Sequence, residues 1–380
     1  MPLTGAQTDQ LQGLFLRLAK IPGVALAERA VADEVTTLLR AAGVRVHEDQ
    51  AGARLHGNAG NLLCFPADFD EHSPTLLLSA HLDTVQSTEK LKPVYHAREI
   101  RSDGATILGA DNRLGVAILT QLLATTARDR LPHKNFMVVF TIAEELGMLG
   151  AALLDLPPFK IAGGFVFDCS KRPGAYIHEC TGSGLFKLTF IGKAAHAGVA
   201  PEEGINAISL ASRALAGIPA GRIDTDLIVN LGKIRGGVAT NIVPDEVVVE
   251  GEVRSFSKQC LHSQLDRIHQ SCAQAMHGEG ALRFESRIDF EPYVLASDSY
   301  VIHLLEGTLR AVNLRPQPIR YMGGSDANVW NAKGIPAVNL GIGAQRPHSF
   351  EEFVLIEDLV KAAEIAFALV QVAERNAQGA

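Results

Sequence analysis

The amino-acid sequence predicts an α/β protein with two domains, the smaller of which is inserted into the larger. Strand-like and helix-like segments alternate up to about residue 180, and the same pattern returns after Pro292. Between them, segments of 181–292 alternate apolar and polar side chains, as half-buried antiparallel strands do. We therefore expect a larger α/β domain over 1–180 and 293–380 and an inserted α+β domain over 181–292. A length of 380 residues suits two domains.

The elements of the larger domain follow from the spacing of its apolar residues. Apolar spacing of three and four predicts helices, whereas short continuous apolar runs predict strands that are buried on both faces. The expected helices are 8–20, 27–42, 112–128, 299–313 and 355–375, and the expected strands are 62–65, 76–78, 136–142, 165–167 and 335–340. Gly43 ends the second helix, as Gly commonly does. The small polar tail after Arg375 is expected to fray.

The inserted domain shows a different pattern. Residues 185–191 and 246–253 alternate apolar and polar side chains, which predicts strands with one solvent-facing side. Residues 205–217 and 257–277 have the amphipathic spacing of helices. These four elements indicate a small α+β unit whose helices cover one face of a sheet.

Composition and charge exclude several classes of function. The hydrophobic fraction of 47% and the charged fraction of 20% are typical of a globular protein. The net charge of −7, without a run of Lys or Arg, argues against nucleic acid as a partner. The start of the chain shows no signal peptide, and no apolar stretch reaches the roughly 18 residues of a membrane span. Five cysteines without a CxxC pair are expected to be reduced thiols, so we expect a cytoplasmic protein without a membrane partner.

Acidic and imidazole side chains follow short apolar runs at five separate places. Each is expected at the end of a buried strand, and the carboxyl ends of parallel strands converge on one crevice. Two histidines and several carboxylates in one crevice form a ligand set for two divalent metals. The sequence therefore favours a hydrolase with a metal-activated water. The five places are Ser79–Asp83, Gly109–Asn112, Ala143–Gly147, Phe167–Cys169 and Pro347–Ser349.

The first two places also have ordinary structural interpretations. In an extended chain His81 and Asp83 point to the same side, so Asp83 can hold the second ring nitrogen of His81 and fix its tautomer. A surface His beside a carboxylate would give the same triplet. Asp111 precedes a helix, where Asp is a common N-cap. Taken alone, Asp111 is better explained as an N-cap. It is interpreted as a ligand that bridges two metals only because the other candidate ligands are present.

The remaining places strengthen the metal hypothesis. Glu144 and Glu145 end a strongly apolar strand, where two carboxylates are costly unless a cation neutralises them. Because adjacent side chains point apart, one of them can bind metal while the other acts as a general base. Asp168 ends another strand, and Cys169 beside it is a softer zinc ligand, although such cysteines are usually packing. His348 follows a Gly-rich loop after the last strand. A lone His in such a loop is usually not a ligand, and it is a candidate here because the other four sites are present.

The order of these motifs, HxD, GAD, EExG, FD and a late PHS, resembles the co-catalytic zinc metallopeptidases, which include peptidase T, glutamate carboxypeptidase and the aminoacylases. Nearly the whole chain follows that layout, and its details resemble the peptidase T-like branch. The segments that carry this likeness are 192–198 (GKAAHAG), 201–204 (PEEG), 221–224 (GRID), 236–237 (GG) and 240–244 (TNIVP). The resemblance implies an α/β fold in which a mixed-sheet zinc-peptidase catalytic domain carries an inserted lid or dimerisation domain.

The resemblance also implies a role for each site residue. His81 and Asp168 would bind one Zn²⁺, Glu145 and His348 the other, and Asp111 would bridge the two ions. Asp83 would orient His81, and Glu144 would be the general base. His196 would polarise the scissile carbonyl, in some relatives from the neighbouring subunit. The substrate would be bound by Asn241, Arg254, Gly324 and Ser325.

One of these roles has an independent physical argument, and several of these residues also have plainer structural explanations. An Arg fork matches a carboxylate in geometry, which supports Arg254, although a strand-end surface Arg is the plainer explanation. Ser325 and the neighbouring Asp326 would equally serve as the cap of a helix. His196 would otherwise be an ordinary loop histidine.

One position departs from the family pattern. Relatives commonly carry Asp-Asp after Gly-Ala, whereas this chain has Asp111-Asn112. The change removes a negative charge beside the site but keeps the bridging ligand, so we expect altered metal affinity rather than loss of binding. Asp168 stands where carboxypeptidase-like members tend to carry Glu, which favours cleavage at the peptide N-terminus.

The resulting hypothesis is a dinuclear zinc aminopeptidase acting on di- or tripeptides and forming a homodimer through the inserted domain. Co²⁺ or Mn²⁺ would also suit a mixed nitrogen and oxygen ligand set. An N-acyl amino acid deacylase or a carboxypeptidase would use the same metals with a different pocket. A catalytically silent peptide-binding protein is disfavoured because Glu144 and the five ligands are all present.

Overall fold

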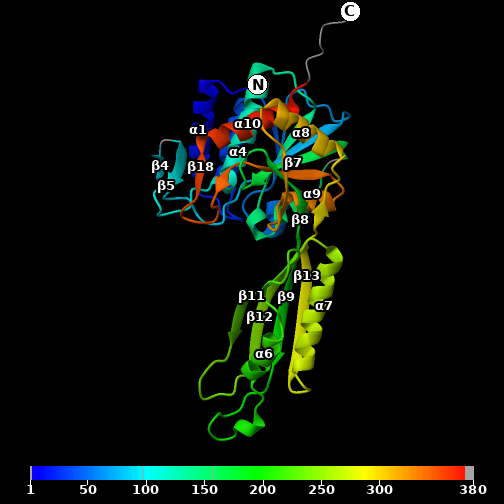
Figure 1. Cartoon of the computed structure of the whole chain (residues 1–380). Helices are drawn as coiled ribbons and strands as arrows, with labels where there is room; N and C mark the ends of the chain where they lie inside the picture. The colour runs from blue at the N-terminus through cyan, green and yellow to red at the C-terminus, as the bar shows by residue number, and fades with distance from the viewer. Residues whose placement is uncertain (1, 97, 157, 373–380) are drawn as a thin grey trace, which may run out of the picture. The chain divides into compact units, whose positions relative to one another are not determined.

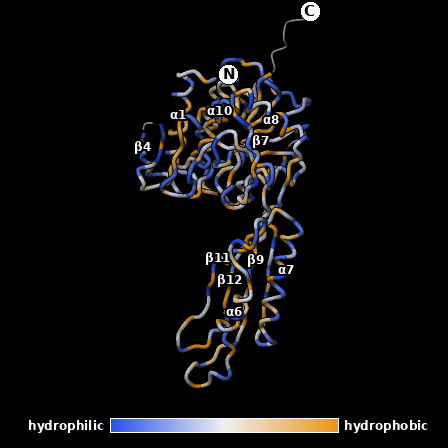
Figure 2. Tube along the Cα trace, in the orientation of Figure 1, coloured by the Kyte–Doolittle hydropathy of each residue, from blue (hydrophilic) through white to orange (hydrophobic). Residues whose placement is uncertain are grey.

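The computed structural model describes residues 2–96, 98–156 and 158–372, and the chain forms two compact units (Figure 1). Unit 1 holds the residues up to His178, then Val294–Arg320 and the residues from Ser325 onward. Unit 2 holds Glu179–Tyr293 and the short segment Tyr321–Gly324. In Figure 2, hydrophobic segments gather in the interior of unit 1, around β7 (Ile161–Cys169) and α10 (Ile356–Val370).

A large mixed sheet organises unit 1. Its central strands β6 (Phe136–Thr141), β3 (Thr75–His81), β7 and β16 (Ala337–Gly341) run parallel. Every residue of β3, β6 and β16 is buried, as the continuous apolar runs predict for strands covered on both faces. The full order is β1-β2-β6-β3-β7-β16-β8-β14, with β15 paired to β8. The outer strands are β1 (Arg45–Glu48), β2 (Leu62–Phe65), β8 (Ala175–Cys180), β14 (Tyr293–Val294) and β15 (Gln317–Tyr321).

Helices cover this sheet, and α4 (Ala110–Asp129) is the most buried of them. Its residues from Asn112 to Leu123 are all buried, because it packs on β3 and β7 and also against helices α1, α2 and α10. Helices α8 and α9 pack on β7 and β16. The other helices of unit 1 are α1 (Gly5–Ala19), α2 (Arg29–Ala41), α3 (Ala51–Leu55), α5 (Leu149–Leu153), α8 (Tyr300–Ala311) and α9 (Asp326–Ala332).

A second, small sheet lies beside the start of α4. Its order is β17-β18-β5-β4, with all three pairings antiparallel. The strands are β4 (Pro93–His96), β5 (Glu99–Ser102), β17 (Ala344–Gln345) and β18 (Phe353–Leu355). This sheet brings the chain before Asp111 and the chain around His348 to the same place.

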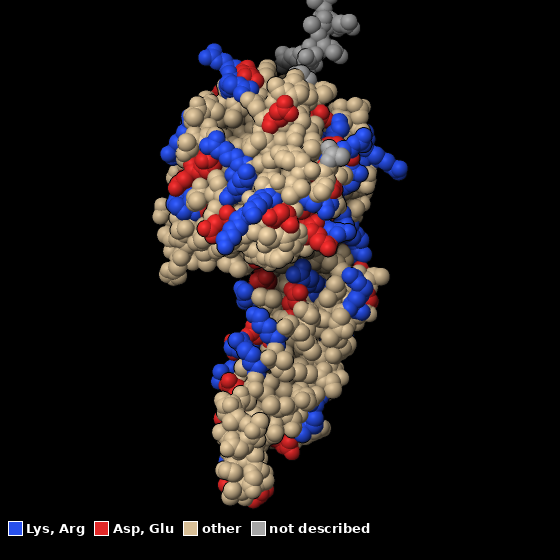
Figure 3. All heavy atoms as spheres, turned by 90° about the vertical axis from the view of Figure 1, so that its left-hand side faces the viewer, with Lys and Arg blue, Asp and Glu red and all other residues tan. Residues whose placement is uncertain are grey.

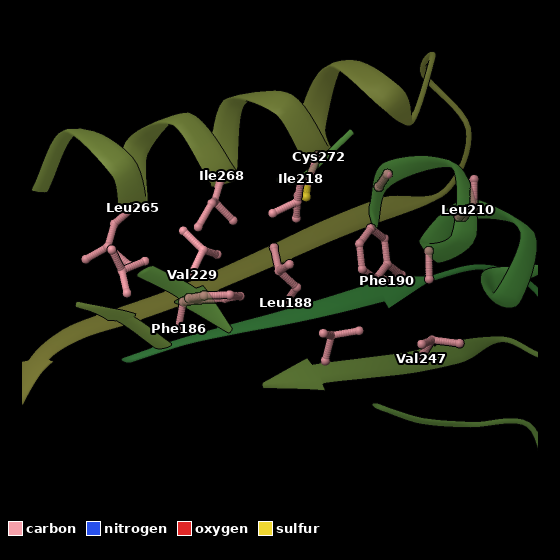
Figure 4. Packing of buried hydrophobic residues seen from close by; sticks show 14 of the residues in the cluster. Phe186, Leu188, Phe190, Leu210, Ile218, Val229, Val247, Leu265, Ile268 and Cys272 are labelled. Carbon is pink, nitrogen blue, oxygen red and sulfur yellow. The ribbon is translucent and has the colours of Figure 1, made fainter. Parts of the chain in front are cut away.

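Unit 2 is an antiparallel sheet with helices on one face. The strand order is β10-β11-β12-β9-β13, and α6 and α7 pack against it. Figure 4 shows Leu265 and Ile268 of α7 pointing toward Phe186 and Leu188 of β9. The elements are β9 (Gly182–Ile191), η2 (Pro201–Glu203), α6 (Ala207–Ala216), β10 (Gly221–Arg222), β11 (Leu227–Gly236), β12 (Glu246–Ser255), α7 (Lys258–Ala275) and β13 (Ala281–Phe290).

Most expected elements are present, but two expectations are wrong. The last helix ends at Val370 rather than 375, because Gln371 is extended and Lys134 binds the carbonyls of Leu369 and Gln371. Residues 373–375 and the tail beyond them lie outside the described part of the chain. Asp111 does not follow a strand: β5 ends at Ser102, and Gly109, with φ of +72°, turns the chain directly into α4.

Candidate metal centre

The first half of the site is built around His81, at the carboxyl end of β3. Its Nε2 lies 3.2 Å from Asp111 Oδ1 and 3.2 Å from Asp168 Oδ1. Its Nδ1 lies 3.3 Å from Asp83 Oδ1 and 3.1 Å from the Asp83 carbonyl. Asp83 therefore holds the far side of the ring, which leaves Nε2 free to face the two carboxylates.

The second half of the site is built around His348, in the loop between β17 and β18. Its Nε2 lies 3.0 Å from Glu145 Oε1 and 3.3 Å from Asp111 Oδ2. The two oxygens of Asp111 thus face different imidazoles, Oδ1 toward His81 and Oδ2 toward His348. The structure brings together all five side chains that we expected to be metal ligands.

The residues present fit divalent metal ions. Zinc bonds to nitrogen and oxygen of 2.0–2.1 Å in a tetrahedral site place neighbouring ligand atoms about 3.3 Å apart, close to the 3.0–3.3 Å observed here. Glu145 Oε1 is buried and, although His348 Nε2 is near, accepts no hydrogen bond among the described residues. His81, Asp111 and Glu145 each offer a ligand atom within 4.8 Å of the others. A buried carboxylate oxygen in this setting is suited to bind a metal ion.

The carboxylates dominate the electrostatics of the protein without metal. Burial alone would raise the pKa of Asp111, but hydrogen bonds from His348 and His81 lower it far below its usual range. Burial alone would lower the pKa of His81, but Asp168, Asp111 and Asp83 raise it well above its ordinary value. The carboxylates of Asp111 and Glu145, whose oxygens lie 3.3 and 3.0 Å from its Nε2, raise the pKa of His348 to about 10. These raised pKa values favour the positively charged form of both imidazoles at neutral pH. A metal ion that binds Nε2 must displace the second ring proton.

Metal affinity should accordingly rise with pH. Because each imidazole must lose its proton to bind metal, we expect the apparent affinity to rise roughly tenfold per pH unit for each proton released between pH 6 and 8. The sign follows from the pKa of His348, raised to about 10, and from the pKa of His81, which is raised in the same direction. Calorimetric titration of the metal-free protein in two buffers with different ionisation enthalpies counts the protons. An affinity independent of pH, after correction for any chelator, would contradict this charge assignment.

Glu144 and Glu145 sit in a tight turn after β6. Residues Glu144–Leu146 form one 3₁₀ turn, flanked by Ala143 and Gly147 with φ of +50° and +99°. Glu144 Oε2 lies 3.9 Å from His81 Nε2, so the carboxyl reaches the cluster without bonding to it. Burial and the nearby Asp168 and Asp326 raise the pKa of Glu144 well above its usual value, although His81 opposes them. Such a carboxyl is suited to accept and return a proton.

Asn112, the departure from the family pattern, contacts a ligand directly. Its side-chain amide donates a hydrogen bond of 3.0 Å to Asp168 Oδ1, and its carbonyl accepts one from Gly115 N at 3.0 Å. Burial raises the pKa of Asp168 to about 6, with Asp111 and Glu145 adding to the effect. The amide therefore supplies a donor where an Asp would bring another negative charge. Asp111 and Asn112 are joined by a cis peptide bond.

Three buried acidic residues support the centre: sequence reasoning missed Glu352 and Glu28, and it considered Asp326 only as part of a Gly-rich turn or helix start. Glu352 accepts the backbone N–H groups of Gly109 at 2.7 Å and Asp111 at 3.0 Å, and so holds the turn that carries Asp111. Asp326 accepts a hydrogen bond from Thr141 Oγ1 at 2.6 Å. Glu28 accepts the N–H groups of Leu26 and Ala143, both at 2.9 Å. The only sequence signal of such residues is an acidic group beside apolar neighbours.

Cys169 does not take part as a ligand in this arrangement. Its side chain is buried, and burial raises the pKa of the thiol to about 12, which keeps it protonated. All five cysteines are free thiols. The packing interpretation of Cys169 therefore accounts for what the structure shows.

The expected substrate residues of unit 2 fall into two groups. His196 and Asn241 are exposed and lie on two joined segments, since Ala197 N donates to the Asn241 carbonyl at 3.0 Å and His196 pairs with Ile242. Arg254, on β12, donates to the Met322 carbonyl at 2.9 Å and lies 6.0 Å from the centre of the Phe290 ring.

Gly324 and Ser325 occupy different settings. A Cβ on Gly324 would come within 2.6 Å of the Phe290 ring, so this position has no room for a side chain. Ser325 is the N-cap of α9: its Oγ accepts a hydrogen bond from Ala327 N at 3.3 Å, and its own backbone N–H donates to Asn328 Oδ1 at 3.1 Å. The cap explanation thus accounts for the Ser325 hydroxyl.

Comparison with known protein families gives two partial matches. A model described as the peptidase dimerisation domain of the M20 peptidases matches residues 179–279. A model for peptidase family M28 matches residues 67–168, the segment that contains His81, Asp111, Glu144, Glu145 and Asp168.

Known proteins resemble the chain over nearly its full length, and three of them show the likeness. The uncharacterised protein YqjE of Bacillus subtilis is 31% identical over 95% of this chain and 97% of its own. The crystal structure of aminopeptidase PepT from Bacillus cereus is 31% identical, covers 96% of this chain and 98% of its own, and has a TM-score of 0.85. A tripeptidase structure from Staphylococcus aureus is 30% identical with the same coverage and a TM-score of 0.89.

These matches confirm the predicted fold class and the predicted family resemblance. The family match and the grouping of His81, Asp111 and Glu145 in the structure both support metal binding. The chain therefore belongs to the peptidase T-like branch of the M20 metallopeptidases and is a metal-dependent peptidase.

Proposed function

We propose that the chain is a dinuclear zinc aminopeptidase that releases the N-terminal residue of di- or tripeptides. The observation that carries this proposal is the position of Asp111, whose two oxygens lie 3.2 and 3.3 Å from the Nε2 atoms of His81 and His348. A carboxylate shared in this way is suited to bridge two ions. The tripeptidase and aminopeptidase similarities support short peptides as the substrate class.

In this proposal each ion has its own pair of ligands. His81 and Asp168 hold one ion, His348 and Glu145 hold the other, and Asp111 serves both. Asp111, Glu145 and Asp168 supply three negative charges, which leaves one positive charge of two dications for an anionic ligand. The mixture of imidazole and carboxylate suits Zn²⁺ and also admits Co²⁺ or Mn²⁺.

The chain's own residues move the proton and bind the substrate. Two bound zinc ions would supply Lewis-acid charge and lower the pKa of water at the site. Glu144 takes the proton from the attacking water and returns it to the leaving amine. Asp83 keeps His81 in the tautomer whose Nε2 faces the centre. This order of proton transfers requires Glu144 to remain free of the metals, as its 3.9 Å separation from His81 Nε2 allows.

Unit 2 is proposed to be a lid and dimerisation domain. His196 is proposed to polarise the scissile carbonyl, acting in its own or the neighbouring subunit. Arg254 and Asn241 are proposed to bind the backbone or carboxylate of the peptide, with Gly324 and Ser325 lining the pocket. Burial of Arg254 is incomplete, with 29% of its side chain exposed, so a substrate can still reach the guanidinium.

The closest alternative is an N-acyl amino acid deacylase or a carboxypeptidase with the same metals. Asp168, in place of the Glu of carboxypeptidase-like members, and the peptidase T-like segments of unit 2 favour the aminopeptidase. A silent peptide-binding protein would have no need of Glu144 beside an intact ligand set.

A substrate panel separates these functions. Free tripeptides, N-acetylated tripeptides and N-acyl amino acids are offered to the zinc-, manganese- and cobalt-loaded protein, with Glu144→Gln as the control. We expect cleavage of free tripeptides with release of the N-terminal residue, and little cleavage of blocked ones. Preference for blocked substrates would move the protein to the deacylase or carboxypeptidase function. Silence on every substrate with metal bound would support the binding protein.

We also propose a homodimer formed through unit 2. Among the described residues, the outer side of β11 from Leu231 to Gly236 pairs with no strand, and Ile234 on it is 63% exposed. Val199 and Val238 are 76% and 83% exposed, and Figure 3 shows few charged atoms on the end of unit 2. Exposed apolar side chains and an open strand edge together favour association with a second copy.

Ile234→Lys should weaken this dimer. A lysine on an open strand edge opposes edge-to-edge pairing, so we expect light scattering after gel filtration to show a shift toward monomer. Tyr95→Lys is the matched control, since Tyr95 is 58% exposed on the edge strand β4 of unit 1. An unchanged dimer in Ile234→Lys, or an equal loss in both variants, would contradict the proposed interface.

Among the described residues, no helix is both long and apolar enough to cross a membrane. The cytoplasmic location expected from the sequence stays a prediction.

A further inference from the structure

Two buried carboxylates, those of Glu28 and Asp83, accept hydrogen bonds from the backbone of the turn that carries Glu144. Three successive backbone N–H groups point at them: Ala143 N donates to Glu28 Oε1 at 2.9 Å, Glu144 N to Asp83 Oδ1 at 3.1 Å, and Glu145 N to Asp83 Oδ2 at 3.0 Å. Asp83 thus has a second task beside orienting His81. Glu28 lies far away in sequence, in the segment that precedes α2.

Glu28 contacts the turn at Ala143, which lies just after β6 in a left-handed backbone conformation. Ala143 has φ of +50° and ψ of +40°, a left-handed conformation that residues with a Cβ seldom adopt. Leu26 has φ of +70°, and its N–H donates to the same Glu28 Oε1 at 2.9 Å. One carboxylate oxygen therefore joins two left-handed residues from distant parts of the chain. Such conformations persist only where the surrounding contacts enforce them.

Glu28 is buried, and it shares the positive charge of one arginine with a second carboxylate. Glu28, Asp83 and Arg113 are all fully buried, and Arg113 supplies the positive charge that both carboxylates face. Arg113 Nη2 donates to the Ile21 carbonyl at 3.2 Å, and a Cβ at Gly23 would come within 2.7 Å of the same nitrogen. The segment from Ile21 to Glu28 is thus folded closely around this charge. Burying a carboxylate costs desolvation free energy, so we look for a role that Glu28 fills in this position.

We infer that Glu28 is a positioning residue for the general base: by accepting the Ala143 N–H, it sets the direction in which Glu144 leaves the strand β6. This inference rests on the proposed role of Glu144. Within the part of the chain that the structure describes, Glu28 forms no hydrogen bond or ion pair with the five candidate metal ligands, and its side chain accepts the backbone N–H groups of Leu26 and Ala143. Its loss should therefore affect the placement of the base and leave the metal ligands in place.

The test compares two substitutions of Glu28 with a matched control. Glu28→Ala removes the acceptor, whereas Glu28→Gln keeps an Oε1 that can accept both N–H groups. Glu364→Ala removes another buried carboxylate of unit 1 that accepts a backbone N–H, that of Leu3 at 3.2 Å. For each variant kcat, KM on a free tripeptide, bound metal per chain and thermal midpoint are measured.

We expect Glu28→Ala to lower kcat about 10- to 100-fold, because a displacement near 1 Å of a catalytic group has an effect of that size. KM and the metal content should stay close to those of the unaltered protein. Glu28→Gln should restore most of kcat, and Glu364→Ala should keep it. Where Glu28→Ala does not fold, Glu28→Asp, which keeps the charge on a shorter side chain, should show the same loss of kcat.

Three results would overturn the inference. They are an unchanged kcat in Glu28→Ala, a loss of metal that accounts for the loss of activity, and a fall in kcat that Glu364→Ala reproduces at equal loss of stability. Failure of the proposed function is seen in a different variant. Full activity of Glu144→Gln would show that Glu144 is not the general base, whatever the Glu28 variants do.

Discussion

Replacing Glu144 with Gln should lower kcat by roughly 10²- to 10⁴-fold, the usual contribution of a positioned general acid–base group. Gln has nearly the same size but cannot accept a proton from water. Since Glu144 is 3.9 Å from His81 Nε2 and makes no shorter contact to a metal ligand that the structure records, the metal content should not change. Steady-state kinetics on a free tripeptide and metal analysis of the same sample measure both quantities.

The neighbouring carboxylate is the control for this experiment. Glu145→Gln alters a proposed ligand, whose Oε1 lies 3.0 Å from His348 Nε2, and should lower the bound metal together with activity. The two adjacent substitutions are therefore expected to separate chemistry from metal binding. Near-full activity of Glu144→Gln, or loss of metal from it, would show that the assignment of the base is wrong.

Replacing Asp111 with Ala should have a still broader effect, because it removes a ligand from both halves of the centre. We expect fewer than two tightly bound ions per chain and a loss of metal affinity larger than the roughly 10- to 100-fold seen when only a residue supporting a ligand is lost. Activity should fall with the metal. Equilibrium dialysis against zinc and kinetics at saturating zinc measure the two effects.

Asp129→Ala, at the opposite end of α4, is a suitable control, since Asp129 is partly exposed and pairs only with Arg128 among the described contacts. It should bind two ions and keep its activity. Two tightly bound ions in Asp111→Ala would contradict the bridging role of this carboxylate.

The fold could be predicted because its signals are local. Continuous apolar runs such as 136–142 became strands buried on both faces, and alternating runs such as 185–191 became strands covered on one face. Helix ends were less predictable where distant contacts decide them. The last helix stops at Val370 because Lys134, which lies ahead of β6, binds the carbonyls of Leu369 and Gln371 on either side of that point.

The metal-facing residues could be selected for a different reason. Charged groups at the ends of apolar runs are costly when buried, so Glu144, Glu145 and Asp168 stand out in the sequence. The structure gathers His81, Asp111, Glu145, Asp168 and His348, although their roles as ligands stay a prediction. His348 and Asp111 were weak signals alone, because a loop His and a helix-start Asp are common.

The residues that hold the site could not be found in the same way. Glu28 and Glu352 bind backbone N–H groups, and every residue except Pro has such a group, so no side-chain pattern marks the partner. Their partners lie 115 and 243 positions away, at Ala143 and Gly109. Only the folded chain shows that these carboxylates are buried under the turns that carry Glu144 and Asp111.

The most direct test of the central claim is anomalous diffraction at the zinc edge from crystals of the zinc-loaded protein. The account predicts two peaks about 3.5–4 Å apart, one beside His81 and Asp168 and the other beside His348 and Glu145, with Asp111 between them. A single peak, or two peaks that Asp111 does not join, would contradict the two-metal centre.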